Sequence, residues 1–355
     1  MKILFLMRKS KHYTNLFVPE LCEQLRRLGH QVQIGMDLLE ESNNNDFDII
    51  HIHWPEYILP TNNPSITDIG ILDIWLKKIS NANIPIVVQC HNLKPHDVKN
   101  EAACRLYDIV YSHATAFVHM GRFSRNYLQS KYSNAIHVVI PHHIYDISHR
   151  FCYDAKMCKR ELNIPENKIC ILSFGKFRND EERTFYNKCR MKFQNDEVFF
   201  IAPGFFRDKL ICRNVFKSIH NILKFYMFKI NGINFTNEIV GEDVMEKYFT
   251  AADIVFIQRQ KILNSGNLPM AFACGKIVVG PDVGNVGEIL KETGNPVFDA
   301  GDSVSATKAI RAGIGLINKN LGFRNRMYAR KHWTCTIVAN DLIGLYTYLK
   351  NEYCK

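Results

Sequence analysis

Short apolar runs alternate with segments of helical periodicity along the whole chain. Lys2–Met7 reads as a first strand, and the apolar positions of Phe17–Leu28 recur at helical spacing until Gly29 stops the helix. Ile84–Cys90 is apolar and β-branched, as expected for a strand buried on both faces. The other elements predicted in this half are Gln31–Gly35, Asp48–Ile52, Ala114–His119 and Ala135–Ile140 as strands, with Glu101–Tyr111 and Gly121–Lys131 as helices. Such repetition predicts a parallel sheet with right-handed crossovers.

The pattern restarts after a stretch rich in His and Tyr, Pro141 to Lys156, which we interpret as an interdomain linker. The strands predicted beyond it are Ile169–Phe174, Val198–Ala202, Ile254–Gln258, Lys276–Gly280 and Pro296–Phe298. The helices are Glu181–Lys192, Asp243–Thr250, Leu268–Cys274, Val286–Thr293, Ser303–Ile317 and Arg324–Leu349. The sequence therefore predicts an α/β chain of two Rossmann-like domains, 1–150 and 151–330, followed by a helix over 331–355. Ligands are expected beyond the carboxyl ends of the strands.

Composition narrows the class of protein. With 355 residues, 46% hydrophobic and 23% charged, the chain reads as a globular protein of two domains. The opening apolar run is too short for a signal-peptide core, and no stretch approaches a membrane span, so we expect a cytoplasmic protein. Eleven cysteines without a CxxC pair favour a reducing compartment.

A net charge of +10 has one local concentration, between Phe205 and Ile230. Six basic residues there stand against Asp208 alone, interleaved with apolar residues at helical spacing. The pattern predicts an amphipathic helix with two interpretations: a core-facing helix with a solvated basic face, or a helix that docks on anionic lipid head groups. Nucleic acid is not expected as a partner, because no recognition motif accompanies the charge.

The segment Ile254–Gly280 carries the strongest chemical signal. A strand ends near Arg259, whose guanidinium group suits phosphate oxygens, and a polar loop follows through Ser265 and Gly266. Pro269 then lies in the first turn of a short helix, whose N-terminal N–H groups favour a diphosphate. An ordinary strand–loop–helix connection would have the same spacing.

The same segment resembles the donor site of glycosyltransferase family 4 and its relatives. Met270-Ala-Phe-Ala-Cys-Gly275 matches the family's Glu-Ala-Met-Ala-x-Gly except at its first residue. Glu246–Ile257 matches the helix and strand that introduce this motif, and Pro281–Glu288 resembles the Gly-rich turn and glutamate that follow it. The resemblance covers roughly a hundred residues. It implies the GT-B fold, with an acceptor-binding first domain, a nucleotide-sugar-binding second domain and a C-terminal helix that returns toward the first.

One departure from the family motif changes the expected mechanism. Retaining members carry two glutamates eight positions apart, which would fall on Ile262 and Met270. The spacing of Arg259, Ser265 and Gly266 instead looks like that of bacterial exopolysaccharide β-mannosyl- and β-glucuronosyltransferases, which work with inversion. Inversion needs a base in the acceptor domain and stabilisation of the departing diphosphate in the donor domain.

The resemblance also assigns donor contacts. The loop Ser173–Arg178 commonly supplies a cation to the pyrophosphate in this superfamily, and a solvated loop charge is the alternative. The donor-binding residues expected in this chain are Lys176, Arg178, Arg259, Ser265, Gly266, Asn267, Leu268 and Glu288.

Three polar clusters follow strands in the first domain, and each contains histidine. They are His51–Glu56, His91–Asp97 and Pro141–His143. An imidazole titrates near neutral pH, so a histidine or carboxylate here is a candidate for the general base. The expected catalytic candidates are Asp97, His91, Glu56 and His53, and the expected acceptor contacts are Trp54, His96 and His142. We expect no metal, because no Cys or carboxylate accompanies His-x-His at zinc-ligand spacing and because the resemblance implies a metal-independent enzyme.

The sequence predicts an inverting hexosyltransferase of bacterial surface polysaccharide synthesis, such as capsule synthesis. It would move a sugar from a UDP- or GDP-sugar, a co-substrate rather than a cofactor, to a saccharide acceptor that is lipid-linked by resemblance. Peripheral contact with the anionic inner face of the cell membrane is the expected location. Three alternatives stay open: a retaining family 4 transferase that uses another carboxylate such as Glu288, a nucleotide-sugar epimerase of the same fold, and a catalytically silent binding protein.

Overall fold

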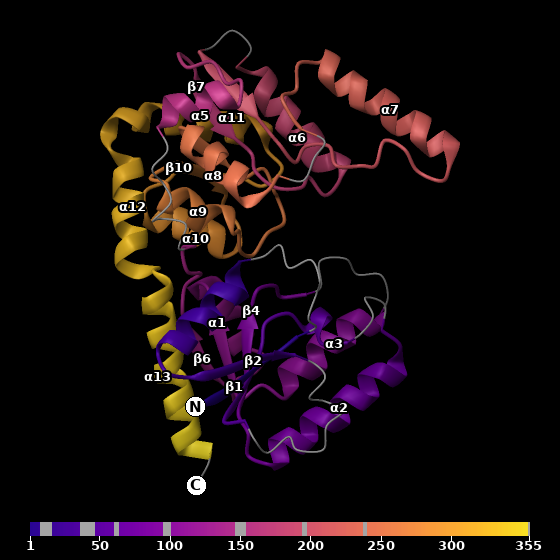
Figure 1. The fold of residues 1–355 in the computed structure, drawn as a ribbon, viewed down its shortest axis with the longest axis vertical. Coiled ribbons are helices and arrows are strands. Elements are labelled where there is room, and N and C mark those ends of the chain that lie inside the picture. Colours follow the sequence, from indigo (N-terminus) through magenta and orange to yellow (C-terminus); the bar gives the residue numbers. More distant parts are fainter. Residues whose placement is uncertain are drawn as a thin grey trace. The chain divides into compact units, whose positions relative to one another are not determined.

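The computed structural model describes residues 1–7, 16–35, 47–59, 64–94, 101–145, 154–193, 197–236 and 240–353. The chain divides into two compact units (Figure 1). The first unit comprises Met1–Tyr145 together with His332–Lys355, and the second comprises Asp146–Lys331. Each unit is described by itself below.

The first unit is built on a sheet of strand order β2-β1-β3-β4-β5-β6, in which every pair is parallel. The strands are β1 (Lys2–Leu6), β2 (Gln31–Gly35), β3 (Ile49–Ile52), β4 (Ile86–Cys90), β5 (Ala116–His119) and β6 (Ile136–Val139). All five residues of β4 are buried, as expected for a strand between two layers of helices.

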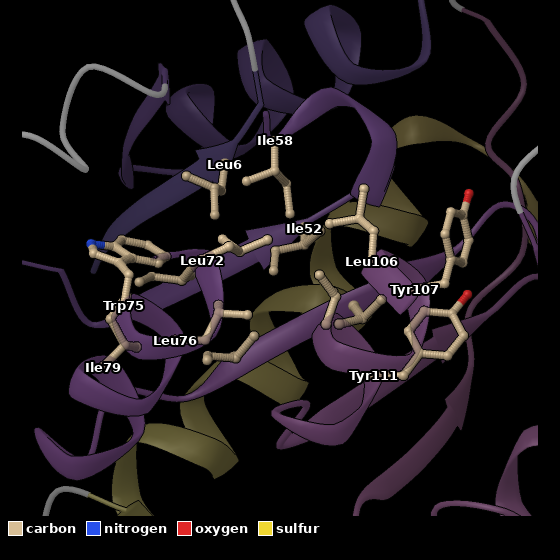
Figure 2. Close-up of a cluster of buried hydrophobic side chains, with 14 of the residues drawn as sticks. Leu6, Ile52, Ile58, Leu72, Trp75, Leu76, Ile79, Leu106, Tyr107 and Tyr111 are labelled. Carbon is tan, nitrogen blue, oxygen red and sulfur yellow. The ribbon is translucent and has the colours of Figure 1, made fainter. Parts of the chain in front are cut away.

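Helices cover both faces of this sheet. They are α1 (Phe17–Arg27), α2 (Ile66–Asn81), α3 (Glu101–Ser112), α4 (Arg122–Gln129) and α13 (Cys335–Tyr353), with a 3₁₀ turn η3 (Pro55–Tyr57). On one face α2 and α3 pack against the strands, and Figure 2 shows Leu72 and Leu76 of α2 beside Ile52 of β3. On the other face α1 lies beside α13, whose Tyr346 is fully buried. The C-terminal helix therefore completes the core of the first unit.

The second unit repeats the design with a sheet of strand order β11-β10-β9-β7-β8, again parallel throughout. Its strands are β7 (Ile169–Leu172), β8 (Val198–Ile201), β9 (Ile254–Phe256), β10 (Ile277–Pro281) and β11 (Val297–Phe298). Its helices are α5 (Ala155–Glu161), α6 (Asp180–Met191), α7 (Val215–Ile230), α8 (Glu242–Ala251), α9 (Asn267–Ala273), α10 (Gly284–Glu292), α11 (Ser303–Leu316) and α12 (Leu321–His332), with a 3₁₀ turn η5 (Ile317–Lys319). The predicted pair of Rossmann-like domains is confirmed.

Three elements differ from the prediction. Helix α2 was not predicted, although Ser65 forms a capping box with Asp68 at its start. The single helix predicted over Arg324–Leu349 is two helices, because the chain breaks at Trp333 and Thr334, where the Thr334 hydroxyl accepts a hydrogen bond from the Ile337 N–H. The interdomain linker predicted from Pro141 to Lys156 overlaps the first turn of α5.

The basic segment from Phe205 to Ile230 does not form the core-facing helix that one of its two interpretations describes. Phe205 and Phe206 are fully buried but precede the helix, which begins only at Val215. Asn221 is the one residue of α7 that is buried, so most of the helix surface faces solvent. Among the described residues, no helix combines the length and apolar character that a membrane crossing requires.

Candidate functional site

Arg259 follows β9, at the carboxyl edge of the second sheet, and most of its side chain is enclosed. Its Nη2 donates a hydrogen bond to the Lys176 carbonyl at 3.2 Å, and its Nε is buried with no acceptor among the described residues. Burial, together with the smaller effect of the nearby positive charge of Arg178, lowers the pKa of Arg259 to about 10. A cation held in this way is stabilised by any anion that reaches it.

The loop that carries Lys176 and Arg178 is held against the end of β8. The Phe177 N–H donates to the Gly204 carbonyl at 3.1 Å, and a Cβ added to Gly204 would lie 2.1 Å from the Gly175 oxygen. Only glycine fits such an approach. The loop therefore brings Gly175 to the Arg259 guanidinium group and leaves Lys176 and Arg178 exposed.

The polar loop after β9 returns to the same place. The Asn267 side-chain amide donates to the Phe174 carbonyl at 2.8 Å, which joins this loop to the one that follows β7. Ser265 is buried, and its carbonyl accepts from the Leu268 N–H. The structure thus gathers the two predicted loops around Arg259.

A third loop, at the start of α10, joins this arrangement. Gly284 has a φ of +59°, and a Cβ there would meet the Ile262 oxygen at 2.6 Å. The buried Asn285 side chain donates to the side-chain Oδ1 of Asn264 at 2.8 Å, and its backbone N–H donates to the Leu263 carbonyl oxygen. Glu288 lies one turn further along α10 and is half-buried.

The positions of the absent glutamates are also clear. Met270 is buried inside α9, and Ile262 is half-buried in the polar loop. Helix α9 begins at Asn267, with Pro269 in its first turn as predicted.

In the first unit, aromatic rings from four segments gather around Phe17, the first residue of α1. The Phe17 ring centroid lies 5.7 Å from that of His53, 5.0 Å from His91, 4.6 Å from His142 and 4.7 Å from His143. These side chains follow β3, β4 and β6, so the three predicted polar clusters meet at one edge of the sheet. We call His51, His53, His91, His142 and His143 the histidine cluster.

Inside the cluster the rings are linked to one another. His53 Nδ1 lies 3.1 Å from His91 Nε2, a hydrogen bond in which one ring donates. Trp54 stacks on His91 with ring centroids 3.9 Å apart and planes inclined by 16°. The Tyr346 hydroxyl shares a hydrogen bond with His51 Nδ1. Trp54 is only half-buried, so one part of it remains accessible.

Burial keeps most of these rings neutral. It lowers the pKa of His51 and of His142 to about 3, and the pKa of His53 well below its usual value of 6.5. A neutral imidazole can accept a proton, which a general base requires. His142 Nδ1 donates to the His143 carbonyl at 2.7 Å, which leaves Nε2 as its basic nitrogen.

Glu56 lies apart from the ring stack, in η3. Its carboxylate accepts a hydrogen bond from the Tyr107 hydroxyl at 2.6 Å, and burial raises its pKa. Asp97 and His96, the remaining predicted residues of the first unit, lie outside the described residues.

Several residues of these sites were not predicted. Phe17 and Tyr346 were predicted only as helix positions, and Gln258 only as the end of a strand. Phe17 and Tyr346 nevertheless contact the histidine cluster, and Gln258 is buried next to Arg259 in the chain. The signal for Gln258 was positional, because it lies where the chain leaves the parallel strand β9. Phe17 begins the helix that follows β1. Tyr346 lies hundreds of residues from the cluster in sequence, so only the fold reveals it.

Known proteins of similar structure decide the fold. No family model matches the chain. Sucrose-phosphate synthase from Thermosynechococcus elongatus superposes with a TM-score of 0.71 at 14% identity, over 98% of this chain and 98% of that one. HepE from Anabaena, solved with UDP and glucose, gives 0.69 at 12% identity, over 98% and 100%. The chain has the GT-B fold.

A curated relative matches in part. A segment of 97 residues is 29% identical to GDP-mannose:glycolipid 4-beta-D-mannosyltransferase of Xanthomonas campestris pv. campestris. The match spans 27% of this chain and 27% of the relative, so the chain covers about a quarter of that protein. The curated relative and sucrose-phosphate synthase are glycosyltransferases. HepE is a protein solved with UDP and a sugar.

Proposed function

We propose that this chain is a glycosyltransferase that takes its sugar from a nucleotide-sugar donor bound in the second unit. The observation that carries the proposal is Arg259, whose buried Nε has no acceptor among the described residues while Arg178 adds a second positive charge nearby. A diphosphate would supply the missing acceptors and offset the repulsion between the two guanidinium groups. Lys176, Asn267 and the backbone of Ser265 to Leu268 border the same place.

The donor is proposed to be a UDP- or GDP-sugar. The name of the partial relative specifies GDP-mannose, and HepE was solved with UDP and glucose. Both nucleotides present the same diphosphate to Arg259. Neither a metal nor a further cofactor is proposed, since two cationic side chains already lie where the leaving charge develops.

Transfer is proposed to proceed with inversion. The two positions that carry glutamates in retaining relatives are Ile262 and Met270 here, and the second of these is buried in apolar surroundings. Attack must then come from an acceptor hydroxyl activated on the opposite face of the sugar. A retaining reaction would instead use another carboxylate of the second unit, such as Glu288.

The base is proposed to lie in the first unit. His91 has the most suitable surroundings among the described candidates, because it stacks on the half-exposed Trp54 and is oriented by His53. Glu56 is the second candidate, since its raised pKa favours proton transfer. Asp97 remains a candidate from the sequence, with His96 and His142 as acceptor contacts.

The acceptor is proposed to be a lipid-linked saccharide of surface polysaccharide synthesis, at the cytoplasmic face of the membrane. Support comes from the word glycolipid in the name of the partial relative. Trp54 offers an aromatic face on which a sugar ring can stack.

A product analysis tests the proposal. The chain is incubated with UDP- and GDP-sugars, with and without a lipid-linked oligosaccharide, and the products are followed by NMR of the anomeric proton. Transfer with inverted configuration is expected. Retained configuration would contradict the inverting mechanism, an altered free donor without acceptor would identify an epimerase, and the absence of any turnover would contradict the enzyme assignment.

Variants of the first unit then locate the base. Loss of a general base lowers kcat by about 10²- to 10⁴-fold. We expect His91→Asn to show this loss and Glu56→Gln to retain most of the activity. The reverse order would transfer the role to Glu56, and loss only in Asp97→Asn would transfer it to Asp97.

A further inference from the structure

Helix α7 presents an unusual surface for an amphipathic helix of a globular domain. Seven of its large apolar side chains face solvent instead of the core, and each of the seven is at least 49% exposed. We call this set the α7 stripe: Val215, Phe216, Ile219, Leu223, Tyr226, Met227 and Ile230. Their spacing of three, four and seven residues places them on one side of the helix.

The opposite side of α7 is already fixed to the second unit. Phe225 and Phe228 contact Phe205 and Phe206, and both join the edge of the second unit's core. The buried Asn221 side chain donates to the Lys209 carbonyl at 2.8 Å. The helix cannot rotate its stripe inward without breaking these contacts, so the exposure of the stripe belongs to the fold.

Polar contacts anchor both ends of α7. The Asn214 side chain caps the N-terminus by accepting from the Lys217 N–H at 3.0 Å. Lys224 forms an ion pair of 2.7 Å with Asp180, at the start of α6, and Lys229 donates to the Phe235 carbonyl. Figure 1 shows α7 at the margin of the second unit.

The charge beside the stripe has one sign. The segment from Phe205 to Ile230 holds six basic residues and one acidic residue, Asp208, which lies 3.6 Å from Arg183. Lys209, Arg213 and Lys217 are exposed, and Ile211, next to Arg213, is 83% exposed. An exposed apolar stripe bordered by lysine and arginine is the arrangement that lies in the interface of an anionic bilayer.

We propose that the α7 stripe docks the second unit on an anionic lipid surface, with its apolar side chains among the acyl chains and Lys209, Arg213 and Lys217 at the phosphate level. The charge argues against a second copy of the chain as the occupant of this surface. A symmetric dimer through α7 would bring two positively charged surfaces together, whereas anionic lipid neutralises them. This inference does not depend on the glycosyltransferase assignment.

The test compares three variants of the full chain on vesicles. Phe216→Ser with Leu223→Ser removes apolar side chains that are exposed, so the core is untouched. Arg213→Ser with Lys217→Ser removes two charges from the border. The matched control is Ile71→Ser with Ile74→Ser on α2, two exposed isoleucines of similar chemistry whose neighbours Asp68, Asp73, Lys77 and Lys78 carry no net charge.

Binding is measured by co-sedimentation with vesicles of phosphatidylcholine alone and of phosphatidylcholine mixed with phosphatidylglycerol. We expect the wild type to prefer the anionic vesicles, the stripe variant to bind them at least about tenfold more weakly, and the charge variant to bind roughly tenfold more weakly. The α2 control should bind as the wild type does. Circular dichroism checks that each variant is folded.

Three results would overturn the proposal. The wild type fails to bind anionic vesicles, or the stripe variant binds as well as the wild type, or sedimentation velocity without lipid finds a dimer that the stripe variant abolishes. The nucleotide-induced thermal shift of the same variants separates this inference from the proposed function, because the stripe lies outside the Arg259 loops. We expect the stripe variant to keep its nucleotide-induced thermal shift and to lose its binding to anionic vesicles.

Discussion

The two units of this chain share one architecture and differ in the chemistry at the ends of their strands. Both are parallel sheets covered by helices, and both gather loops at the carboxyl edge. In the first unit those loops carry the histidine cluster, and twelve of the fourteen histidines lie in this unit. In the second unit the loops carry Arg259, Lys176 and Arg178. The difference separates two tasks: neutral rings suit proton transfer, and fixed cations suit phosphate.

The chain offers a convenient way to observe the units separately. All three tryptophans, Trp54, Trp75 and Trp333, belong to the first unit. Tryptophan emission therefore follows the unfolding of that unit, while calorimetry reports both. The predictions below use this separation.

The largest effect is expected from Arg259→Ala. Removing a charge-assisted contact to the leaving diphosphate should lower kcat/KM by about a hundredfold. Arg324→Ala is the matched control, because within the described part of the chain the side chain of this exposed arginine of α12 donates only to the nearby Lys319 carbonyl. Steady-state rates of sugar transfer measure both variants. Equal rates for the two would break the assignment of phosphate binding to the Arg259 loop.

The next effect concerns the stability of the second unit. Gly284→Ala places a Cβ 2.6 Å from the Ile262 oxygen at a positive φ, and should destabilise this unit by about 2 kcal/mol. Calorimetry should show that the unfolding transition of the second unit, which tryptophan emission does not follow, moves to lower temperature.

A helical glycine of the first unit provides the control. Gly70 lies in α2 with nothing near an added Cβ, so Gly70→Ala should stabilise its unit by about 0.5–1 kcal/mol. A second unit that Gly284→Ala stabilises or leaves unchanged would contradict the close approach at Gly284.

Acid should destabilise the first unit selectively. The pKa values of His51 and His53 lie below 6.5 in the folded chain, so the stability that these rings contribute is present above pH 6.5. For His51 it is lost as pH falls from 6.5 toward about 3, by at most about 1.4 kcal/mol per pH unit. The loss from His53 has the same sign, because its pKa is also lowered. Denaturant unfolding followed by tryptophan emission, at about pH 7 and about pH 5.5, measures this loss.

Replacing one ring sharpens the result. His51→Asn should reduce the acid sensitivity of the first unit, and His220→Asn on the exposed face of α7 should leave it unchanged. An unaltered slope in His51→Asn would mean that this ring is already protonated in the folded chain.

Glu56→Gln is expected to give the smallest effect. Because burial raises the pKa of Glu56 above its usual 4.5, the stability associated with its protonated form is lost as pH rises beyond 4.5. The stability of the variant relative to the wild type should therefore rise toward neutral pH. Denaturant unfolding followed by tryptophan emission measures this difference in stability between the variant and the wild type. A relative loss of stability in the variant would show that the Tyr107 hydrogen bond outweighs the burial of the charge.

Most of the fold could be predicted because a parallel sheet with crossover helices gives a regular alternation of apolar strand runs and helical periodicity in the sequence. The interior strands were found within one or two residues, as with Ile254–Gln258 for β9. Helix α2 escaped because Ile66, Ile71 and Ile74 are exposed and disturb its apolar period. Helix α7 was found, but its orientation could not be predicted, since an apolar stripe looks the same whether it faces core or solvent.

The candidate site residues also differ in how far the sequence could predict them. The donor loops are local motifs, so Arg259, Ser265 and Gly266 could be named from sequence and found close together. The histidine cluster depends on contacts between distant segments, as with Phe17 and His143, and sequence could supply its candidates but not their pairing. Which of them acts as base stays a prediction.

The most direct test of the nucleotide-sugar assignment is the thermal response to UDP and GDP, recorded for the wild type and Arg259→Ala. A ligand at about 100 times its dissociation constant should stabilise the fold by about 2.7 kcal/mol. We expect one of the two nucleotides to raise the transition of the wild type and to lose this effect in Arg259→Ala. No shift with either nucleotide, or equal shifts in wild type and variant, would contradict the account.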